Sequence, residues 1–122
     1  VSRENIYMSG QSEPFKRISV DEAYKLYGEG NSTVVDVRQV DEWNAGHVRD
    51  AVHIPVEDII SQVDSLPNDG NLLFICAQGV RSALACEMAA AMGRESGILF
   101  NIEEGTGAWI ERGYPTTYGN DS

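Results

Sequence analysis

Short apolar runs alternate with segments of helical periodicity along most of this chain, and this alternation restricts the possible folds more than any other feature. The runs are rich in Val, Ile, Leu and Phe, as buried strands are. They occupy residues 33–37, 51–55, 72–75 and 98–102. Helices are predicted after the capping box Ser19–Glu22 and at residues 57–66, 80–92 and 106–112. Because strands and helices alternate, we predict an α/β domain with a mainly parallel central sheet and helices on both faces.

The segment 80–92 carries the clearest helical pattern. Val80, Leu84, Met88 and Met92 follow one another at steps of four, which places them on one face of the predicted helix. An apolar face of this kind is expected to pack against the core.

Length and composition fit one small domain. The 122 residues are 42% hydrophobic, which suffices for a single core. We predict that residues 1–14 form an N-terminal tail or arm, 15–118 the domain and 119–122 a short C-terminal tail. No apolar run approaches the roughly 18 to 20 residues that a membrane span needs, so no membrane association is expected.

The chain is strongly acidic, with 9 Lys and Arg against 19 Asp and Glu and a formal net charge of −10. Nucleic-acid-binding surfaces need clustered cations, so no nucleic-acid partner is expected. The two cysteines are too few for a disulfide scaffold or for a zinc site built from Cys pairs, and no metal site is predicted. Free cysteines fit a reducing compartment, which makes the cytoplasm the expected location.

Cys76 lies where a predicted strand ends and a helix has yet to begin, the end of the sheet at which α/β proteins bind ligands. Six residues follow it: Ala77, Gln78, Gly79, Val80, Arg81 and Ser82. Their amides can converge on one point if Gly79 takes a positive φ. These amides, the helix dipole and the charge of Arg81 would lower the pKa of the Cys76 thiol below its ordinary value of about 8.5 and make it nucleophilic. The alternative is a buried strand-end cysteine followed by an ordinary strand-to-helix turn.

Three motifs, in register over residues 15–116, resemble those of single-domain rhodaneses. The segment Cys76–Ser82 has the form C-x-x-G-x-R-S of their active-site loop. Residues 35–48 resemble the family's D-V-R-x-x-x-E-[FW]-x-x-G-H-[IV] segment and continue into residues 51–55, which are similar to A-x-N-I-P. Residues 105–115 resemble its closing G-G-x-x-x-W…G-x-P pattern.

Two positions depart from the family pattern. Arg49-Asp50 stands where the family often has Pro-Gly, and Glu104 replaces the first of the two closing glycines. Both lie outside the Cys76 loop, so we expect them to affect local conformation more than chemistry.

The resemblance implies a rhodanese-like fold and a sulfurtransferase that needs no metal or organic cofactor. The Cys76 thiolate would take a sulfane sulfur from thiosulfate or a persulfide donor and hold it as a persulfide near the amides of residues 77–82. A thiol or cyanide acceptor would then remove the sulfur, and a protein could serve as relay partner. Arg81 would bind the substrate anion, and Gln78, at the entrance, would influence the choice of acceptor.

Supporting roles are expected for several polar and aromatic residues. The resemblance implies a buried ion network that shapes the site, made of Asp36, Arg38 and Glu42. Structural positions are expected for the remaining candidates, namely His47, His53, Trp43, Trp109 and Cys86.

Two other functions stay open. One is a sulfur-carrier or regulatory module that docks on a protein partner and turns over little, which the short, acidic chain favours. The other is a phosphatase, since phosphatases share this fold. Four residues separate Cys76 from Arg81, whereas the phosphatase-type loops of this fold have one more, so loop length favours sulfur transfer.

Overall fold

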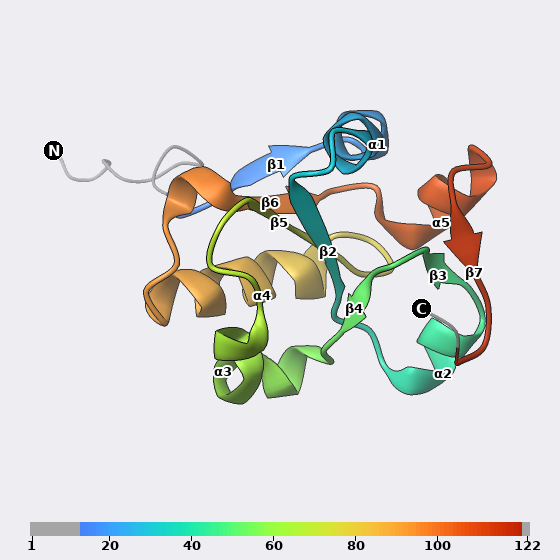
Figure 1. The fold of residues 1–122 in the computed structure, drawn as a ribbon. Helices are drawn as coiled ribbons and strands as arrows, with labels where there is room; N and C mark the ends of the chain where they lie inside the picture. The colour runs from blue at the N-terminus through green and yellow to red at the C-terminus, as the bar shows by residue number, and fades with distance from the viewer. Residues whose placement is uncertain (1–12, 121–122) are drawn as a thin grey trace, which may run out of the picture.

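A parallel sheet forms the centre of the computed structural model, which describes residues 13–120 (Figure 1). Five strands lie in the order β1-β6-β5-β2-β4, and every neighbouring pair is parallel. Their bounds are β1 Lys16–Ile18, β2 Ser32–Asp36, β4 Val52–His53, β5 Asn71–Ile75 and β6 Leu99–Ile102. Two short strands, β3 (His47–Val48) and β7 (Thr116–Thr117), pair antiparallel beside this sheet. The predicted α/β class and parallel sheet are confirmed.

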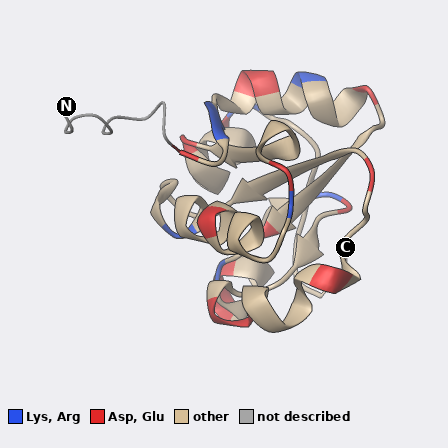
Figure 2. Ribbon diagram, turned by 90° about the vertical axis from the view of Figure 1, so that its left-hand side faces the viewer, with Lys and Arg blue, Asp and Glu red and all other residues tan. Residues whose placement is uncertain are grey.

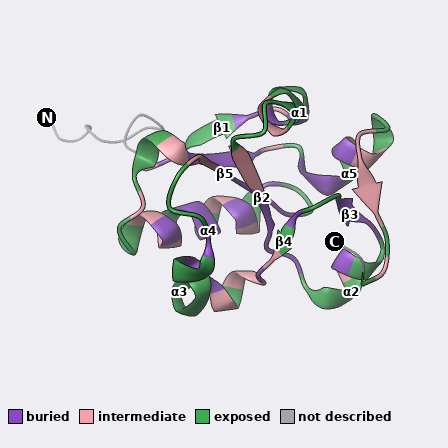
Figure 3. Ribbon diagram, in the orientation of Figure 1, coloured by how far each residue is buried: buried purple, intermediate pink, exposed green. Residues whose placement is uncertain are grey.

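Helices cover both faces of the sheet, as predicted (Figures 1 and 2). α1 (Val20–Gly28) and α5 (Gly105–Glu111) share one core with the strand residues Leu73 and Ile75. α3 (Ile59–Gln62) and α4 (Val80–Ala91) share the other core with Leu72, Phe74 and Cys76. The two cores alternate along β5 because successive strand residues point to opposite faces. The central strands β5 and β6 are accordingly the most buried strands, whereas the edge strands β1 and β4 are partly exposed (Figure 3).

The start of α1 follows the predicted capping box. The Ser19 hydroxyl accepts a hydrogen bond from the Glu22 amide at 3.1 Å, and the Glu22 carboxylate accepts one from the Ser19 amide at 2.9 Å. Glu104, which stands in place of a glycine, accepts a further hydrogen bond from the amide of Val20 at 2.8 Å. Its φ of −79° is an ordinary one, so this position does not require glycine. The departure from the family pattern therefore adds a second cap to α1.

Two predicted elements are less regular than their sequence patterns suggest. The predicted helix 57–66 is a run of η2 (Val56–Asp58), α3 and η3 (Val63–Ser65). The predicted strand 51–55 is reduced to β4, because it lies at the sheet edge and Pro55 has no amide to continue the pairing.

The predicted core face of α4 is wrong except at Met88, which is partly buried against the core. Val80 is 76% exposed and Leu84 47%, and Met92, which follows the helix, is 45% exposed. Small residues face the sheet instead, namely Ser82, Ala85, Cys86 and Ala89. Because these side chains are short, the helix can approach β5 and β6 closely, and Val80 and Leu84 remain on the outer side.

The predicted tail residues 1–12 and 121–122 lie outside the described residues, so the predicted domain boundaries stay a prediction. Within residues 13–120, no helix has the length and apolar character that a membrane crossing requires. The same residues contain no group of three His, Cys, Asp or Glu side chains that could hold a metal ion.

Candidate active site

Cys76 directly follows β5, at the carboxyl end of the sheet and next to the end of β2. The amide of Val37 donates to the carbonyl oxygen of Ile75 at 3.0 Å, which holds the two strand ends together. Cys76 itself is only 1% exposed and faces the α4 side of the sheet. This is the predicted strand-end position.

The loop after Cys76 turns its hydrogen-bond donors toward the sulfur. The Gly79 amide donates to Sγ at 3.1 Å and the Ser82 amide at 3.4 Å, while the Ser82 hydroxyl lies 3.3 Å from it. Burial by itself raises the pKa of the Cys76 thiol, but the Ser82 hydroxyl and the amides of Ser82, Gln78 and Gly79 outweigh burial and lower this pKa below its ordinary value. A thiol in this environment forms its nucleophilic thiolate more readily.

Gly79 has the predicted positive φ, 86°, and a second glycine, Gly105, packs closely against the backbone of the same loop. A Cβ at Gly79 would lie 2.6 Å from the carbonyl oxygen of Glu103, and one at Gly105 would lie 2.0 Å from that of Ala77. Thr106, in the first turn of α5, donates to the carbonyl oxygen of Cys76 from its amide at 2.9 Å and from its hydroxyl at 3.2 Å. The turn between β6 and α5 thus sets the backbone of the Cys76 loop.

Asn101 is a site residue that the sequence analysis missed. It lies fully buried on β6. Its side-chain oxygen accepts a hydrogen bond from the Ser82 hydroxyl, and its nitrogen donates to the carbonyl oxygen of Gly79 at 3.0 Å. Asn101 therefore holds both residues whose amides contact the sulfur. A buried polar residue in an otherwise apolar strand was the available signal.

Arg81 points to a carboxylate of its own chain. Its guanidinium donates two hydrogen bonds to Glu42, which lies on α2 (Val40–Asn44), at 2.7 and 2.9 Å. Hydrogen bonding from Arg81 lowers the pKa of Glu42 to about 2, although partial burial opposes this effect. The pair is about one-third exposed. The anion-binding role of Arg81 stays a prediction, and any such anion would share the guanidinium with Glu42.

Asp36 and Arg38 form a separate, buried pair at the end of β2. The Arg38 guanidinium donates to the Asp36 carboxylate at 2.8 and 3.0 Å and to the Gly46 carbonyl oxygen at 2.8 Å. Asp36 is fully buried and Arg38 is 6% exposed. The predicted network of three residues is seen in part: Glu42 is hydrogen-bonded to Arg81, and it interacts with Arg38 only through the charge of that guanidinium. The separate positions arise because Glu42 lies on α2 and reaches outward to α4.

The aromatic and histidine residues pack next to this pair. The Trp43 ring stacks on His47 with the ring centres 3.4 Å apart, and on His53 at 4.7 Å. Nδ1 of the buried His47 lies 2.8 Å from the Trp43 carbonyl oxygen, and Nε2 of His53 lies 2.7 Å from that of Arg38. Trp109 is fully buried. These positions agree with the expected structural roles, which stay a prediction.

The remaining predicted residues lie at the outer edge of the site or in the core. Ala77, Gln78 and Val80 are exposed, and no hydrogen bond of Val80 to the sulfur is seen among the described residues. Cys86 is fully buried on the inner face of α4, and burial raises the pKa of its thiol. Both thiols are free. The structure agrees with the packing role expected for Cys86.

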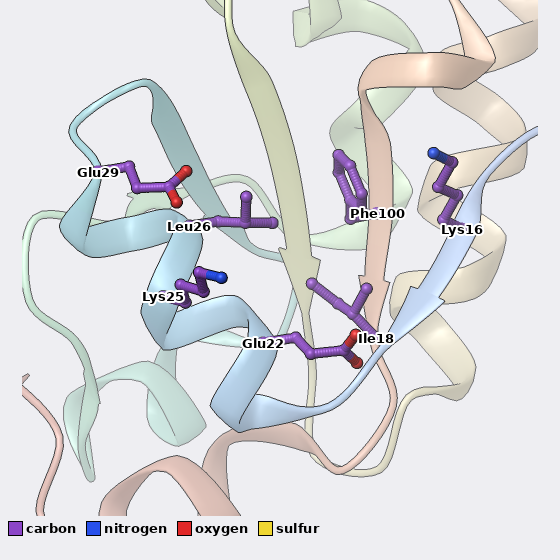
Figure 4. Close-up of a pocket in the computed structure, with 7 residues that line it drawn as sticks. All are labelled: Lys16, Ile18, Glu22, Lys25, Leu26, Glu29 and Phe100. Atoms are coloured by element: carbon purple, nitrogen blue, oxygen red, sulfur yellow. The ribbon is translucent and has the colours of Figure 1, made fainter.

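A surface pocket lies away from Cys76, between α1 and strands β1 and β6 (Figure 4). Its apolar lining comes from Ile18, Leu26 and Phe100, and two lysines and two glutamates surround it. Because its charged groups balance and it lies on the α1 face of the sheet, whereas Cys76 faces the α4 side, this pocket takes no part in the site.

The geometry of the Cys76 loop agrees with the comparison with known families. The rhodanese-like domain model matches residues 19–112, which include every element from α1 to α5. The chain belongs to the rhodanese-like domain family. This rhodanese-like chain is 32% identical over 85 residues to the Bacillus subtilis (strain 168) protein named "Putative sulfurtransferase YtwF", covering 70% of the chain and 80% of that protein.

Solved structures show the same fold. A rhodanese-related protein from Thermoplasma volcanium is similar with a TM-score of 0.74 and 30% identity, over 84% of this rhodanese-like chain and 98% of that protein. A rhodanese-like domain protein from Staphylococcus aureus is similar with a TM-score of 0.69 and 32% identity, over 78% and 91% of the two chains.

Proposed function

We propose that this rhodanese-like domain is a sulfurtransferase that carries a sulfane sulfur on Cys76. The observation that supports the proposal best is the set of polar groups around Sγ: two donating amides at 3.1 and 3.4 Å, and the Ser82 hydroxyl oxygen at 3.3 Å. The same donors that stabilise a thiolate would stabilise the terminal anion of a persulfide, one sulfur further out.

The reaction consists of two displacements. The Cys76 thiolate attacks the outer sulfur of thiosulfate or of a persulfide, a new S–S bond forms, and the donor's S–S bond breaks to release sulfite or a thiolate. An acceptor thiolate then attacks the outer sulfur of the Cys76 persulfide and leaves as a persulfide. The bonding electrons return to Sγ, so Cys76 is restored without any oxidant or reductant. With cyanide as the acceptor, the product is thiocyanate.

Mass spectrometry of the intact protein tests the proposal. After incubation with thiosulfate or a small persulfide, the wild type should gain about 32 Da, one sulfur atom, and cyanide should remove it. Cys76→Ser should gain nothing, whereas the control Cys86→Ala should behave as the wild type, because Cys86 is buried away from solvent. An adduct that persists in Cys76→Ser would refute the proposal.

Steady-state assays separate the neighbouring functions. Thiocyanate formation from thiosulfate and cyanide that depends on Cys76 indicates a turnover enzyme. An adduct on Cys76 without turnover indicates a carrier or regulatory module. Hydrolysis of an aryl phosphate that depends on Cys76 would indicate a phosphatase instead, in conflict with the proposal.

A further inference from the structure

The surface around Cys76 is formed by three linked segments, residues 39–44, 56–65 and 77–91, which we call the α2–α4 face. The Gln39 side chain donates to the Glu57 carboxylate at 3.0 Å, which connects α2 with η2. The Arg81–Glu42 pair connects α2 with α4. Ile59 of α3 packs in the same core as Ala85 of α4. These contacts make the face one continuous surface beside the nucleophile.

The α2–α4 face is strongly acidic, although its site carries a cation. It contains one Lys or Arg, Arg81, against six carboxylates: Asp41, Glu42, Glu57, Asp58, Asp64 and Glu87. Glu42 already balances the charge of Arg81 at 2.7 Å. The structure shows no ion pair for the other five within residues 13–120. More acidic than basic positions are visible in Figure 2 as well. An anionic donor or acceptor would meet net repulsion as it approaches Cys76.

Four large apolar side chains stand out among these charges. Their exposed fractions are 76% for Val80, 59% for Val40, 53% for Ile60 and 47% for Leu84. Val80 and Leu84 are neighbours on the outer side of α4, and Val80 begins that helix four residues after Cys76. Single exposed apolar residues are common, but four on linked elements around a nucleophile indicate a contact surface.

Acidic charge and apolar anchors together define the partner that fits this face. We infer that Cys76 exchanges its sulfur with a thiol on a basic polypeptide that docks on the α2–α4 face, with apolar side chains against Val80 and Leu84. This inference rests on the proposed function. The polypeptide's thiolate attacks the outer sulfur of the Cys76 persulfide, takes it as its own persulfide and leaves the Cys76 thiolate; delivery to Cys76 is the reverse reaction.

Single-turnover transfer to two peptides tests the inference. The protein is first loaded with one sulfur, and the adduct of about 32 Da is verified by mass spectrometry. A protein that fails to load overturns the proposed function, and this outcome is seen before any peptide is added. Two synthetic peptides of equal length then each offer one Cys beside a Leu, flanked by Lys in one and by Glu in the other. We expect transfer to the Lys peptide to be about tenfold faster at low salt. At about 1 M salt, where screening acts beyond about 3 Å, most of this difference should vanish.

Charge variants show whether the α2–α4 face causes the preference. The triple variant Asp41→Asn, Glu57→Gln, Glu87→Gln removes three exposed carboxylates from the face and should lose most of the preference for the Lys peptide. The matched control Glu29→Gln, Asp69→Asn, Glu111→Gln removes three exposed carboxylates elsewhere and should keep it. Because the same two peptides are used throughout, differences between their thiols cancel. Equal rates for both peptides in the wild type, or equal loss in both triple variants, would overturn the inference.

The apolar anchors are tested on one helix. Leu84→Gln should slow transfer to the Lys peptide several-fold, while Met92→Gln, just past the far end of α4 and similarly exposed at 45%, should not. Both variants should load with sulfur at the wild-type rate when a small persulfide is the donor. Equal effects of the two variants on peptide transfer would remove Val80 and Leu84 from the proposed contact.

Discussion

Asn101, on β6, accepts a hydrogen bond from the hydroxyl of Ser82, on α4, and this places that hydroxyl 3.3 Å from the sulfur of Cys76. The surroundings of the Cys76 sulfur are therefore set from two directions. The loop after Cys76 supplies donating amides, and a residue in a neighbouring strand fixes the position of the Ser82 hydroxyl.

Replacing Ser82 should make the Cys76 thiolate form less readily. Ser82→Ala removes the hydroxyl that lies 3.3 Å from the sulfur and helps to lower the pKa of Cys76, so the pKa should rise and alkylation at neutral pH should slow. The measurement is the rate of iodoacetamide modification against pH, whose midpoint should move upward. Ser61→Ala, at an exposed position on α3, should leave the profile unchanged. An unchanged midpoint in Ser82→Ala would mean that the amides alone set the pKa.

Two glycines in α5 should respond oppositely to alanine. At Gly105 the φ is 81° and a Cβ would meet the Ala77 carbonyl oxygen at 2.0 Å, so Gly105→Ala should lower the free energy of unfolding by about 3 kcal/mol or more. At Gly107 a Cβ meets nothing within 4 Å, so Gly107→Ala should raise it by about 0.5 to 1 kcal/mol. Urea denaturation measures both. Similar effects at the two positions would contradict the close approach of α5 to the Cys76 loop.

Asp50 is the one described residue other than glycine with a positive φ, 68°. It also stands where the family often has glycine. Asp50→Gly should therefore raise the free energy of unfolding by about 0.5 to 1 kcal/mol, because glycine adopts this backbone conformation without strain. Thermal unfolding checks the direction. Asp69→Gly, at a position without positive φ, should not stabilise the protein. A loss of stability in Asp50→Gly would show that the Asp side chain contributes more than its backbone strain costs.

The Glu42–Arg81 pair should make stability depend on pH in the acid range. The pKa of Glu42 is about 2 in the folded chain against an ordinary 4.5. A lowered pKa stabilises the fold above the ordinary value and loses this contribution as the pH falls from about 4.5 to 2. Because the pair is one-third exposed, its contribution should be about 1 kcal/mol or less. As the pH falls across this range, the free energy of unfolding measured with urea should decrease more for the wild type than for Glu42→Gln. If the free energies of unfolding of the two proteins changed equally with pH, Arg81 would not stabilise the Glu42 carboxylate.

The sequence was sufficient to predict the parallel sheet, the strand-end position of Cys76 and the positive φ of Gly79, because these follow from local patterns and chain order. It did not predict β1, β3, β7 or α2, whose two to five residues are too few for a periodic signal. The partner of Arg81 was also out of reach, since Glu42 is 39 positions away and only the packing of α2 against the start of α4 brings the two together.

Asn101 and the inner face of α4 were missed for a different reason. A pattern of large apolar residues shows where large side chains lie. Close packing of a helix on a sheet depends instead on small side chains at the interface, which such a pattern does not reveal. At α4 the residues at the interface are Ser82, Ala85, Cys86 and Ala89. Asn101 could not be assigned before its distance to Ser82 was known, because a polar residue in a strand equally fits an edge or an exposed face.

The inward small residues of α4 separate two kinds of evolutionary constraint on the same helix. On the inner side, any enlargement would push the helix off β5 and disturb Cys76, so little variation can be tolerated. On the outer side, Val80, Leu84 and Met92 can be exchanged with less effect on folding, since about half or more of each side chain is exposed. The exposed side of α4 can thus diverge between related chains while the helix face that supports the Cys76 loop stays constant.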